Sequence, residues 1–383
     1  MISFFLFLSS KSSVYMRLEQ LSLLNFKNLR QVDLTFSSKI NCLLGLNGMG
    51  KTNLLDAIYY LSFCKSHTHA LDPSIICHKE DFFLLQGTYV TDQNESELIS
   101  CGYKRGKKKK FKRNAKEYAK LSEHIGRIPL IMISPADNIL ISGGSDERRR
   151  FMDMVISQYN IDYLNALLRY NKALSQRNAL LKQGATDETL FLVWEEMMAS
   201  EGQFIYQERI SFLASFIPLF QRYYSYLSAE NESVQLSYKS DVAMEPLIDL
   251  LRKSRTKDMV MGYSLKGIHK DDLIMSLGES LIKREGSQGQ NKTFLIALKL
   301  AQFDFLKNAG RAVTPILLFD DIFDKLDGSR VKKIVQLVAE DNFGQIFMTD
   351  TDYKHLERIL SDGHLTYKLF QVEQGEITEK VIV

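Results

Sequence analysis

The segment GLNGMGKT, residues 45–52, combines a glycine-rich turn with a lysine and a hydroxyl residue. Glycines allow backbone N–H groups to converge on phosphate oxygens, and a helix that starts at such a turn adds a favourable field. At this spacing Lys51 reaches the terminal phosphates of a nucleotide, and the Thr52 hydroxyl ligates Mg²⁺. We therefore expect a phosphate-binding loop made of Gly45, Leu46, Asn47, Gly48, Met49, Gly50, Lys51 and Thr52.

Two adjacent acids near the other end of the chain can complete this site. Asp320 and Asp321 follow ILLF, residues 316–319, an apolar run typical of a buried strand. A nucleotide site of this kind needs an acid that holds the metal. We assign Asp320 to Mg²⁺, and Asp321 together with Lys51 to catalysis, with Asp321 orienting or deprotonating an attacking water. A loop with two incidental acids is the competing interpretation, and the phosphate-binding loop makes it the weaker one.

The elements that position these residues can be located from local pattern. KINCLL, residues 39–44, is typical of a buried strand, and TNLLDAIYYLS, residues 52–62, has apolar residues at helical spacing. The phosphate-binding loop therefore lies between a strand and the helix that it opens, as the chemistry requires.

The long separation between Lys51 and Asp320 excludes several nucleotide-binding classes. In compact kinases and small GTPases the two parts belong to one short unit, so a large insertion is expected here. A GTPase would also need an Asn-Lys-x-Asp motif that reads the base, and NKTF, residues 291–294, lacks the acid.

A third motif indicates which class of nucleotide-binding protein this is. GSQGQNKTFLIALKLAQ, residues 286–302, places Ser287, Gly289 and Gln290 at the start of an amphipathic pattern. It resembles the LSGGQ signature of ABC-type ATPases, with Gly286 in place of Leu and Gln288 in place of the first Gly. The resemblance implies that Ser287, Gly289 and Gln290 contact an ATP held by a second subunit, so that ATP joins two heads.

Two departures from the ABC pattern indicate slow turnover. Asp321 stands where ABC enzymes usually have Glu, and no histidine follows GQIFMT, residues 344–349, where the family has its switch histidine. DKLD, residues 324–327, corresponds to the family's D-loop. We therefore expect a slow ATPase that works as a conformational switch.

The middle of the chain is predicted to be helical. From residue 151 to about 227 apolar residues recur at intervals of three and four residues, as expected for one face of a helix. Leu164, Leu167, Leu174 and Leu181 belong to this apolar seam, and Asn171 and Asn178 interrupt it. An antiparallel helical hairpin and an ordinary helical subdomain fit equally well. The expected fold is α/β: an ABC-type ATPase head with an inserted helical arm lobe. Its parts are residues 16–140 for the first half of the head, 141–260 for the arm and 261–383 for the second half.

The composition of the chain indicates the cellular compartment in which it works. The 383 residues carry a net charge of +3, no apolar run is long enough to span a bilayer, and four cysteines show no disulfide framework. A reducing cytoplasm and no membrane partner are therefore expected. We interpret residues 1–15 as a mis-assigned leader, with Met16 as the start.

A basic run, residues 104–120, stands out against an otherwise mildly acidic chain. It follows a strand-like segment, and we expect it at the tip of a β-hairpin, where lysines suit phosphate contact without sequence reading. A charged tip that protects a sheet edge is equally plausible. Arg148, Arg149 and Arg150 are a second basic group, for which we favour a structural role. The DNA-binding candidates are Lys104, Arg105, Lys107, Lys108, Lys109, Lys110, Lys112 and Arg113.

From Met16 onward the chain resembles the RecF family of bacterial DNA replication and repair proteins. The resemblance rests on LNFKN (residues 24–28), NGMGKTNLLDAIYYLSFCKSH (47–67), ISPADNILISGGSDERRRFMD (133–153), YNKALSQRNALLK (170–182), KGIHKDDL (266–273) and SQGQNKTFLIALKLAQ (287–302). Ile268 and Lys270 replace the family's Pro and Arg, and Lys lacks the two-pronged contact of Arg.

The resemblance implies an ATP- and Mg²⁺-dependent homodimer that binds duplex DNA at gaps and junctions. With RecR and RecO, such proteins help RecA to load in gap repair and replication restart, and they support the SOS response. They are weak ATPases. A nucleotide-binding scaffold without significant turnover is the alternative.

Overall fold

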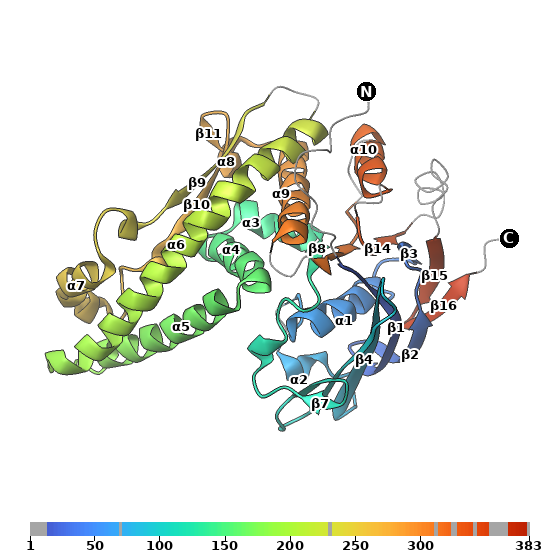
Figure 1. Cartoon of the computed structure of the whole chain (residues 1–383), viewed down its shortest axis with the longest axis horizontal. Coiled ribbons are helices and arrows are strands. Elements are labelled where there is room, and N and C mark those ends of the chain that lie inside the picture. Colours follow the sequence, from blue (N-terminus) through green and yellow to red (C-terminus); the bar gives the residue numbers. More distant parts are fainter. Residues whose placement is uncertain are drawn as a thin grey trace. The chain divides into compact units, whose positions relative to one another are not determined.

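The computed structural model describes residues 14–68, 71–228, 232–309, 313–322, 328–339, 343–351 and 367–380 (Figure 1). The chain packs as two units, of which the first comprises Met1–Pro135 and Phe303–Val383 and the second Ala136–Gln302. The second unit thus extends past residue 260, where we expected the arm to end, and includes the signature segment. Residues 1–13 of the expected leader lie outside the described residues.

The first unit contains a mostly parallel sheet of order β16-β15-β3-β14-β13-β8. Its strands β3, β8, β13 and β14 are buried along their length, as expected for parallel strands covered on both faces. The sheet is formed by β3 (Ile40–Leu44), β8 (Leu130–Ile133), β13 (Ile316–Phe319), β14 (Ile346–Asp350), β15 (Tyr367–Glu373) and β16 (Glu376–Lys380).

An antiparallel sheet in the same unit has the order β12-β1-β4-β5-β6-β7, and β2 pairs with β1. Burial alternates along β2 and much of β4, because one face of the sheet is packed and the other is not. Leu61 of α1 (Lys51–Phe63) contacts the packed face at Gly87. The strands are β1 (Val14–Phe26), β2 (Leu29–Thr35), β4 (Phe82–Thr91), β5 (Ser96–Lys104), β6 (Lys110–Arg113), β7 (Lys116–Glu117) and β12 (Val313–Thr314); α2 (Asp72–Ile75) and α10 (Gly328–Ala339) are further helices of this unit.

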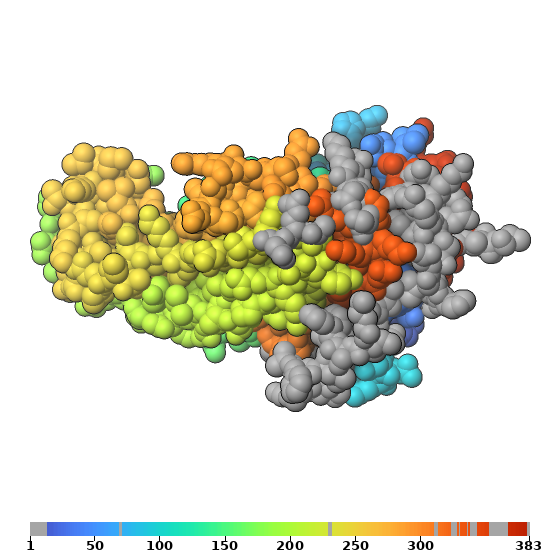
Figure 2. Space-filling model, turned by 90° about the horizontal axis from the view of Figure 1, so that it is seen from above, coloured from blue at the N-terminus to red at the C-terminus, as the bar shows by residue number. Residues whose placement is uncertain are grey.

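The second unit is dominated by α5 (Ile161–Lys182) and the long α6 (Glu188–Leu227), which lie side by side in Figure 1, with α7 (Leu247–Met261) against both. The helical prediction is therefore confirmed. Figure 2 shows α6 and α7 forming one continuous face of this unit. Its other elements are α3 (Ile139–Ser142), α4 (Ser145–Tyr159), α8 (Ile282–Glu285), α9 (Gln288–Asn308), which crosses the boundary at residue 302, and the sheet of β9 (Val234–Lys239), β10 (Asp272–Leu277) and β11 (Ser280–Leu281).

The buried face of α5 differs from the leucine seam expected from sequence. Leu164, Leu167 and Leu174 are only half-buried, whereas Leu181 is buried. The face that packs is rotated by about one residue, because small alanines let the helices approach and aromatic rings fill the gaps. It consists of Tyr163, Ala166, Tyr170, Ala173, Arg177 and Leu181.

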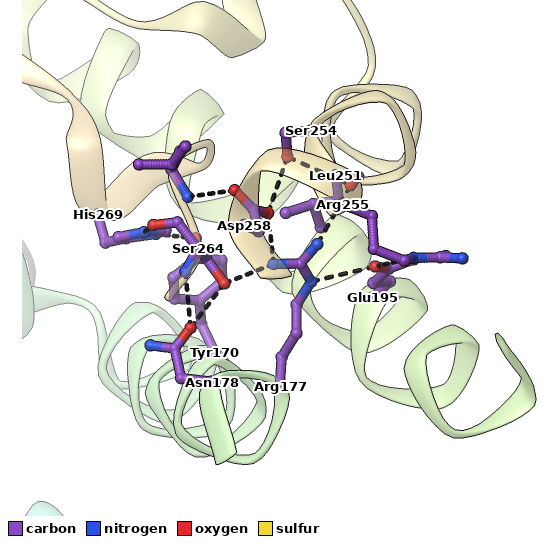
Figure 3. Close-up of polar contacts among 11 residues, drawn as sticks. Tyr170, Arg177, Asn178, Glu195, Leu251, Ser254, Arg255, Asp258, Ser264 and His269 are labelled. Atoms are coloured by element: carbon purple, nitrogen blue, oxygen red, sulfur yellow. Dashed lines mark hydrogen bonds and ion pairs between the residues drawn. The ribbon is translucent and has the colours of Figure 1, made fainter. Parts of the chain in front are cut away.

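A buried ionic cluster joins the three helices (Figure 3). Arg177 of α5 is fully buried; its guanidinium lies 3.1 Å from Glu195 of α6 and 2.8 Å from Asp258 of α7. It also donates to the Ser264 hydroxyl and to the Leu251 carbonyl. The cluster therefore connects α5, α6 and α7 through buried ion pairs and hydrogen bonds.

Candidate nucleotide site

The phosphate-binding loop lies where sequence predicted it, between β3 and α1. Gly48 and Gly50 adopt positive φ angles of 80° and 119°, which favour glycine. A Cβ at Gly45 would lie 2.3 Å from the Val372 carbonyl oxygen of β15. The glycines are thus required by the turn and by a close backbone approach.

Lys51 opens α1 and is only 3% exposed. Its ammonium donates to the Gly45 carbonyl oxygen at 2.6 Å and to that of Leu46 at 3.2 Å. It forms no ion pair with any residue that the structure describes. Both of these hydrogen-bond partners are neutral, and the Asp320 carboxylate is close enough to interact electrostatically with Lys51. An ammonium group held in this way at a glycine-rich loop suits the phosphates of a nucleotide.

Asn28, from the turn between β1 and β2, braces the loop from outside. Its side-chain amide donates to the Met49 carbonyl at 3.3 Å, and its oxygen accepts from Asn53 at 2.7 Å. The backbone N–H of Gly375, in the turn between β15 and β16, donates to the same Met49 carbonyl at 2.9 Å. Sequence analysis assigned no role to Asn28 or Gly375, although Asn28 ends the LNFKN stretch.

Asp320 lies at the carboxyl end of β13 and meets the loop directly. Its Oδ1 accepts a hydrogen bond of 2.9 Å from the Thr52 hydroxyl. Burial raises the pKa of Asp320 to about 6, with a smaller contribution from the neighbouring Asp321 carboxylate. The two residues assigned to Mg²⁺ are therefore in contact, and a carboxylate beside a hydroxyl at the foot of a phosphate-binding loop is a donor set that fits this metal.

Thr349, at the end of β14, links the two acids. Its hydroxyl oxygen accepts from the Asp321 N–H at 2.8 Å and lies 3.1 Å from Asp320 Oδ1 and 3.0 Å from Asp321 Oδ1. Asp321 has a φ of 46°, an unusual conformation for a residue other than glycine. Sequence reasoning missed Thr349, even though it ends the GQIFMT stretch in which a switch histidine was sought.

The signature residues begin α9 in the second unit. Ser287 and Gln290 bond reciprocally: the Ser287 N–H donates to the Gln290 side chain at 2.7 Å, and the Gln290 N–H donates to the Ser287 hydroxyl at 3.2 Å. This is a capping box, which defines the helix start and leaves the exposed Ser287 at its N-terminus. The expected D-loop, residues 324–327, lies entirely outside the described part of the chain.

The basic run forms a β-hairpin, in which β5 and β6 pair and residues 105–109 make the turn. Lys109 differs from its neighbours, because its ammonium lies 3.0 Å from Asp72 and donates to Tyr60 and to the Cys64 carbonyl. Arg113 pairs with Glu97 on β5. Both side chains are engaged within the fold. The remaining candidates are exposed or half-buried: Lys104, Arg105, Lys107, Lys108, Lys110 and Lys112.

The second basic group is internally paired. Arg148 contacts both carboxylate oxygens of Asp272, at 2.7 and 3.0 Å, and Arg150 contacts Glu147 at 2.9 Å. Arg149 donates to the Asp271 carbonyl oxygen at 2.6 Å. These contacts agree with the structural role that we favoured.

The KGIHKDDL segment is also bound into the second unit. Asp271 lies 3.2 Å from Arg209, a fully buried arginine of α6, and His269 lies 2.8 Å from the Tyr170 hydroxyl. The Lys270 ammonium is 5.1 Å from the Tyr263 ring. No helix among the residues that the structure describes is long and apolar enough to cross a bilayer.

Comparison with known sequences gives one consistent result. The family described as RecF/RecN/SMC N terminal domain matches residues 17–378. The DNA replication and repair protein RecF of Phocaeicola vulgatus is 62% identical over 366 residues, which cover 95% of this chain and 99% of that protein. The RecF of Bacteroides fragilis strain ATCC 25285 is 60% identical over 365 residues, covering 95% and 98%.

Solved structures agree. A structure of the recombination mediator protein RecF with ATP, in the RecFOR pathway, superposes with a TM-score of 0.86 at 28% identity, covering 96% of this chain and all of that one. The Smc head domain of Pyrococcus furiosus, with a TM-score of 0.56 and 18% identity over 95% of this chain and 96% of that one, shares the fold. The expected mixed α/β ATPase head with a long helical segment is confirmed.

Proposed function

The chain belongs to the RecF family of DNA replication and repair proteins, and on this premise we propose that it is an ATP-dependent, DNA-binding recombination mediator. Two subunits close around ATP and hold duplex DNA at gaps and junctions. With RecR and RecO the dimer promotes RecA loading in the cytoplasm, in gap repair, replication restart and the SOS response.

One observation carries the ATP part of the proposal: among the described residues the buried Lys51 ammonium hydrogen-bonds carbonyl oxygens, and the loop around it contacts Asp320 through Thr52. ATP would lie along the loop from Gly45 to Thr52, and Thr52 and Asp320 would hold Mg²⁺. When bound, the metal would neutralise phosphate charge during hydrolysis.

The chain's own residues supply the rest of the chemistry. Lys51 binds the terminal phosphates, and Asp321 accepts a proton from, or orients, the attacking water. Aspartate is one methylene shorter than the glutamate of ABC enzymes, which supports slow turnover. Slow hydrolysis suits a switch, since the closed dimer would persist until ATP is spent.

The signature supports a two-subunit site. The capped N-terminus of α9 carries the exposed Ser287 with Gly289 and Gln290, and a helix N-terminus favours a phosphate. These residues would contact the ATP held by the partner subunit.

The dimer is tested by light scattering with ATP, with ADP and without nucleotide, in the presence and absence of gapped DNA. We expect ATP alone to promote a dimer, and Lys51→Ala and Ser287→Arg to abolish it. Glu279→Arg adds an arginine at an exposed position of the same unit and is the matched control. A monomer under all conditions would contradict the proposal.

The basic hairpin is proposed as a DNA contact. Replacing Lys107 and Lys108 with glutamine should reduce the slope of log affinity against log salt by about 2, because each phosphate contact contributes about 0.9. Lys172 and Lys257, exposed on the second unit, provide the control pair. An unchanged slope would remove the hairpin turn from the DNA interface.

The alternative, a nucleotide-binding scaffold without turnover, is favoured by Asp321 and by the missing switch histidine. Steady-state phosphate release separates the two. Release by the wild-type protein that Asp321→Asn abolishes supports the ATPase, whereas equal background release from both supports the scaffold.

A further inference from the structure

The antiparallel sheet of the first unit has an outer face that is hollowed and partly apolar. Along β4, Phe83 and Leu85 point into the core, while Phe82 and Leu84 alternate with them on the opposite face. Leu84 is 47% exposed. Phe82 and Leu84, together with Leu24 of β1 and Gly102 of β5, line a hollow of about 1020 Å³.

One side of this hollow is strongly basic. Lys104, Lys110 and Lys112, from β5 and β6, line it together with the turn lysines Lys107 and Lys108. None of these five ammonium groups forms an ion pair with a residue in the described part of the chain, in contrast to Lys109. Asp33 of β2 lines the hollow as well, so the positive charge is not spread over the whole lining.

An occupant must match both the apolar floor and the basic side. A nucleic-acid strand suits the lysines but not the floor, since bases stack on aromatic rings and Leu24 and Leu84 are aliphatic. Two aromatic residues are among those that line the hollow, Phe82 of β4 and Tyr103 of β5. Tyr103 is the cross-strand partner of the buried Phe83 and contacts its ring, so only Phe82 lies on the face of Leu84. A peptide can meet both demands, because its apolar side chains bury against leucines while its carboxylates pair with lysines.

We propose that this outer face, defined by Leu24, Phe82, Leu84, Lys104, Lys110 and Lys112, is a docking surface for an acidic peptide segment with large apolar side chains. The peptide lies across β1, β4 and β5. The polar side chains Ser22, Gln86 and Ser100, which also line the hollow, are placed to bond its backbone. The lysines select for acidic partners, and the leucines provide the apolar contact.

The surface is distinct from the nucleotide site. It involves no residue of the phosphate-binding loop or of the acids that follow β13, so docking requires neither ATP nor a second subunit. A failure of ATP-dependent dimerisation would therefore not contradict peptide docking. Likewise, a failure of the peptide to bind would not contradict ATP-dependent dimerisation.

The test is fluorescence anisotropy with a labelled peptide of about twelve residues, rich in aspartate and containing leucine and phenylalanine. We expect binding to the full-length protein, weakened at least tenfold, or about 1.4 kcal/mol, by Leu84→Asp and by the pair Lys110→Glu and Lys112→Glu. Leu71→Asp is the matched control, because Leu71 is a 77% exposed leucine of the same unit outside this face. Thermal melts establish that each variant is folded.

Three comparison ligands make the outcome specific. A peptide with lysine in place of aspartate, and a polyaspartate of equal length, should both bind weakly. An oligothymidine of equal length should bind Leu84→Asp as well as wild type. Failure of the acidic apolar peptide to bind, equal affinity for the Leu84 and Leu71 variants, or an oligothymidine that depends on Leu84 would each overturn the proposal.

Discussion

Thr349 has one hydroxyl proton and two carboxylates within reach. It accepts the Asp321 N–H and can donate to Asp320 or to Asp321, but not to both at once. The side chain is 1% exposed, so water does not substitute for it. If Thr52 and Asp320 hold Mg²⁺, the hydroxyl proton becomes available to Asp321. The geometry makes Thr349 a positioning residue for the acid that is proposed to orient water.

Replacing Thr349 with valine should lower kcat for ATP hydrolysis at least about tenfold, since a misplaced general base loses part of its contribution of about 10²–10⁴. KM for ATP should change little, because Lys51 and Thr52 are untouched. Thr349→Ser keeps the hydroxyl and should stay near wild type. Steady-state kinetics and nucleotide binding by calorimetry measure both quantities. Equal kcat for the valine and serine variants would exclude the positioning role.

At the scale of elements, the helical arm depends on polar as well as apolar packing. The Arg177 guanidinium has partners on α6 and α7, and Arg255 of α7 also reaches Glu195, at 2.6 Å. Asn178, which sequence placed in a helical seam, instead accepts from the N–H and hydroxyl of Ser264, after α7. These contacts fix how α5, α6 and α7 pack.

Arg177→Met should destabilise the second unit by about 3–5 kcal/mol, because it leaves Glu195 and Asp258 buried with less compensation. Trp194, the single tryptophan of the chain, lies in α6 beside Glu195 and reports the unfolding of this unit by fluorescence in urea.

Arg169→Met is the matched control for this change. Arg169 also joins α5 to α6, through Glu201, but its side chain is 53% exposed. An exposed pair contributes at most about 1 kcal/mol. Equal effects of the two substitutions would mean that the buried cluster does not stabilise the arm.

At the scale of the whole molecule, each unit contains a histidine that its surroundings hold neutral, fully buried in the case of His124 and half-buried in the case of His269. Burial lowers the pKa of His124 in the first unit and of His269 in the second, each to about 4. His124 Nε2 lies 2.7 Å from the Leu61 carbonyl oxygen, which assigns the proton to that nitrogen. Its other nitrogen faces the Tyr118 hydroxyl.

Stability should therefore fall as pH drops from about 6.5 to 4. Between these pH values the histidines bind protons in the unfolded chain but stay neutral in the folded protein. Each histidine therefore contributes on the order of 3 kcal/mol to the free energy of unfolding above pH 6.5, and this contribution is lost as the pH falls. Asp320 acts in the opposite sense, because its raised pKa means that the folded state holds a proton which the unfolded state releases, and it offsets part of the loss.

Urea unfolding at several pH values, followed by far-UV circular dichroism, measures this dependence. His124→Gln should flatten the pH dependence of the first unit, whereas His78→Gln, at an exposed position, should not. A pH dependence unaffected by His124→Gln would show that this imidazole is not the titrating group.

The sequence by itself determined the features that depend on neighbouring residues. The phosphate-binding loop, the strand before it, the helix after it and the capped start of α9 follow from residue types at short spacing. The family resemblance, which rests on such stretches, is confirmed. The basic hairpin was found in the same way, because alternation and turn composition are local signals.

Only the tertiary structure decided which distant residues meet. β3 pairs with β14 on one side and with β15 on the other, so Thr349 reaches the acids after β13, and the β15–β16 turn reaches Met49. Nothing in the basic run distinguishes Lys109 from Lys108 until Asp72 folds against it. Likewise, α5 buries an arginine that local periodicity would leave in solvent, because its acidic partners come from two other helices. Strand order and the positions of counter-charges arise from long-range packing, which one-dimensional spacing does not encode.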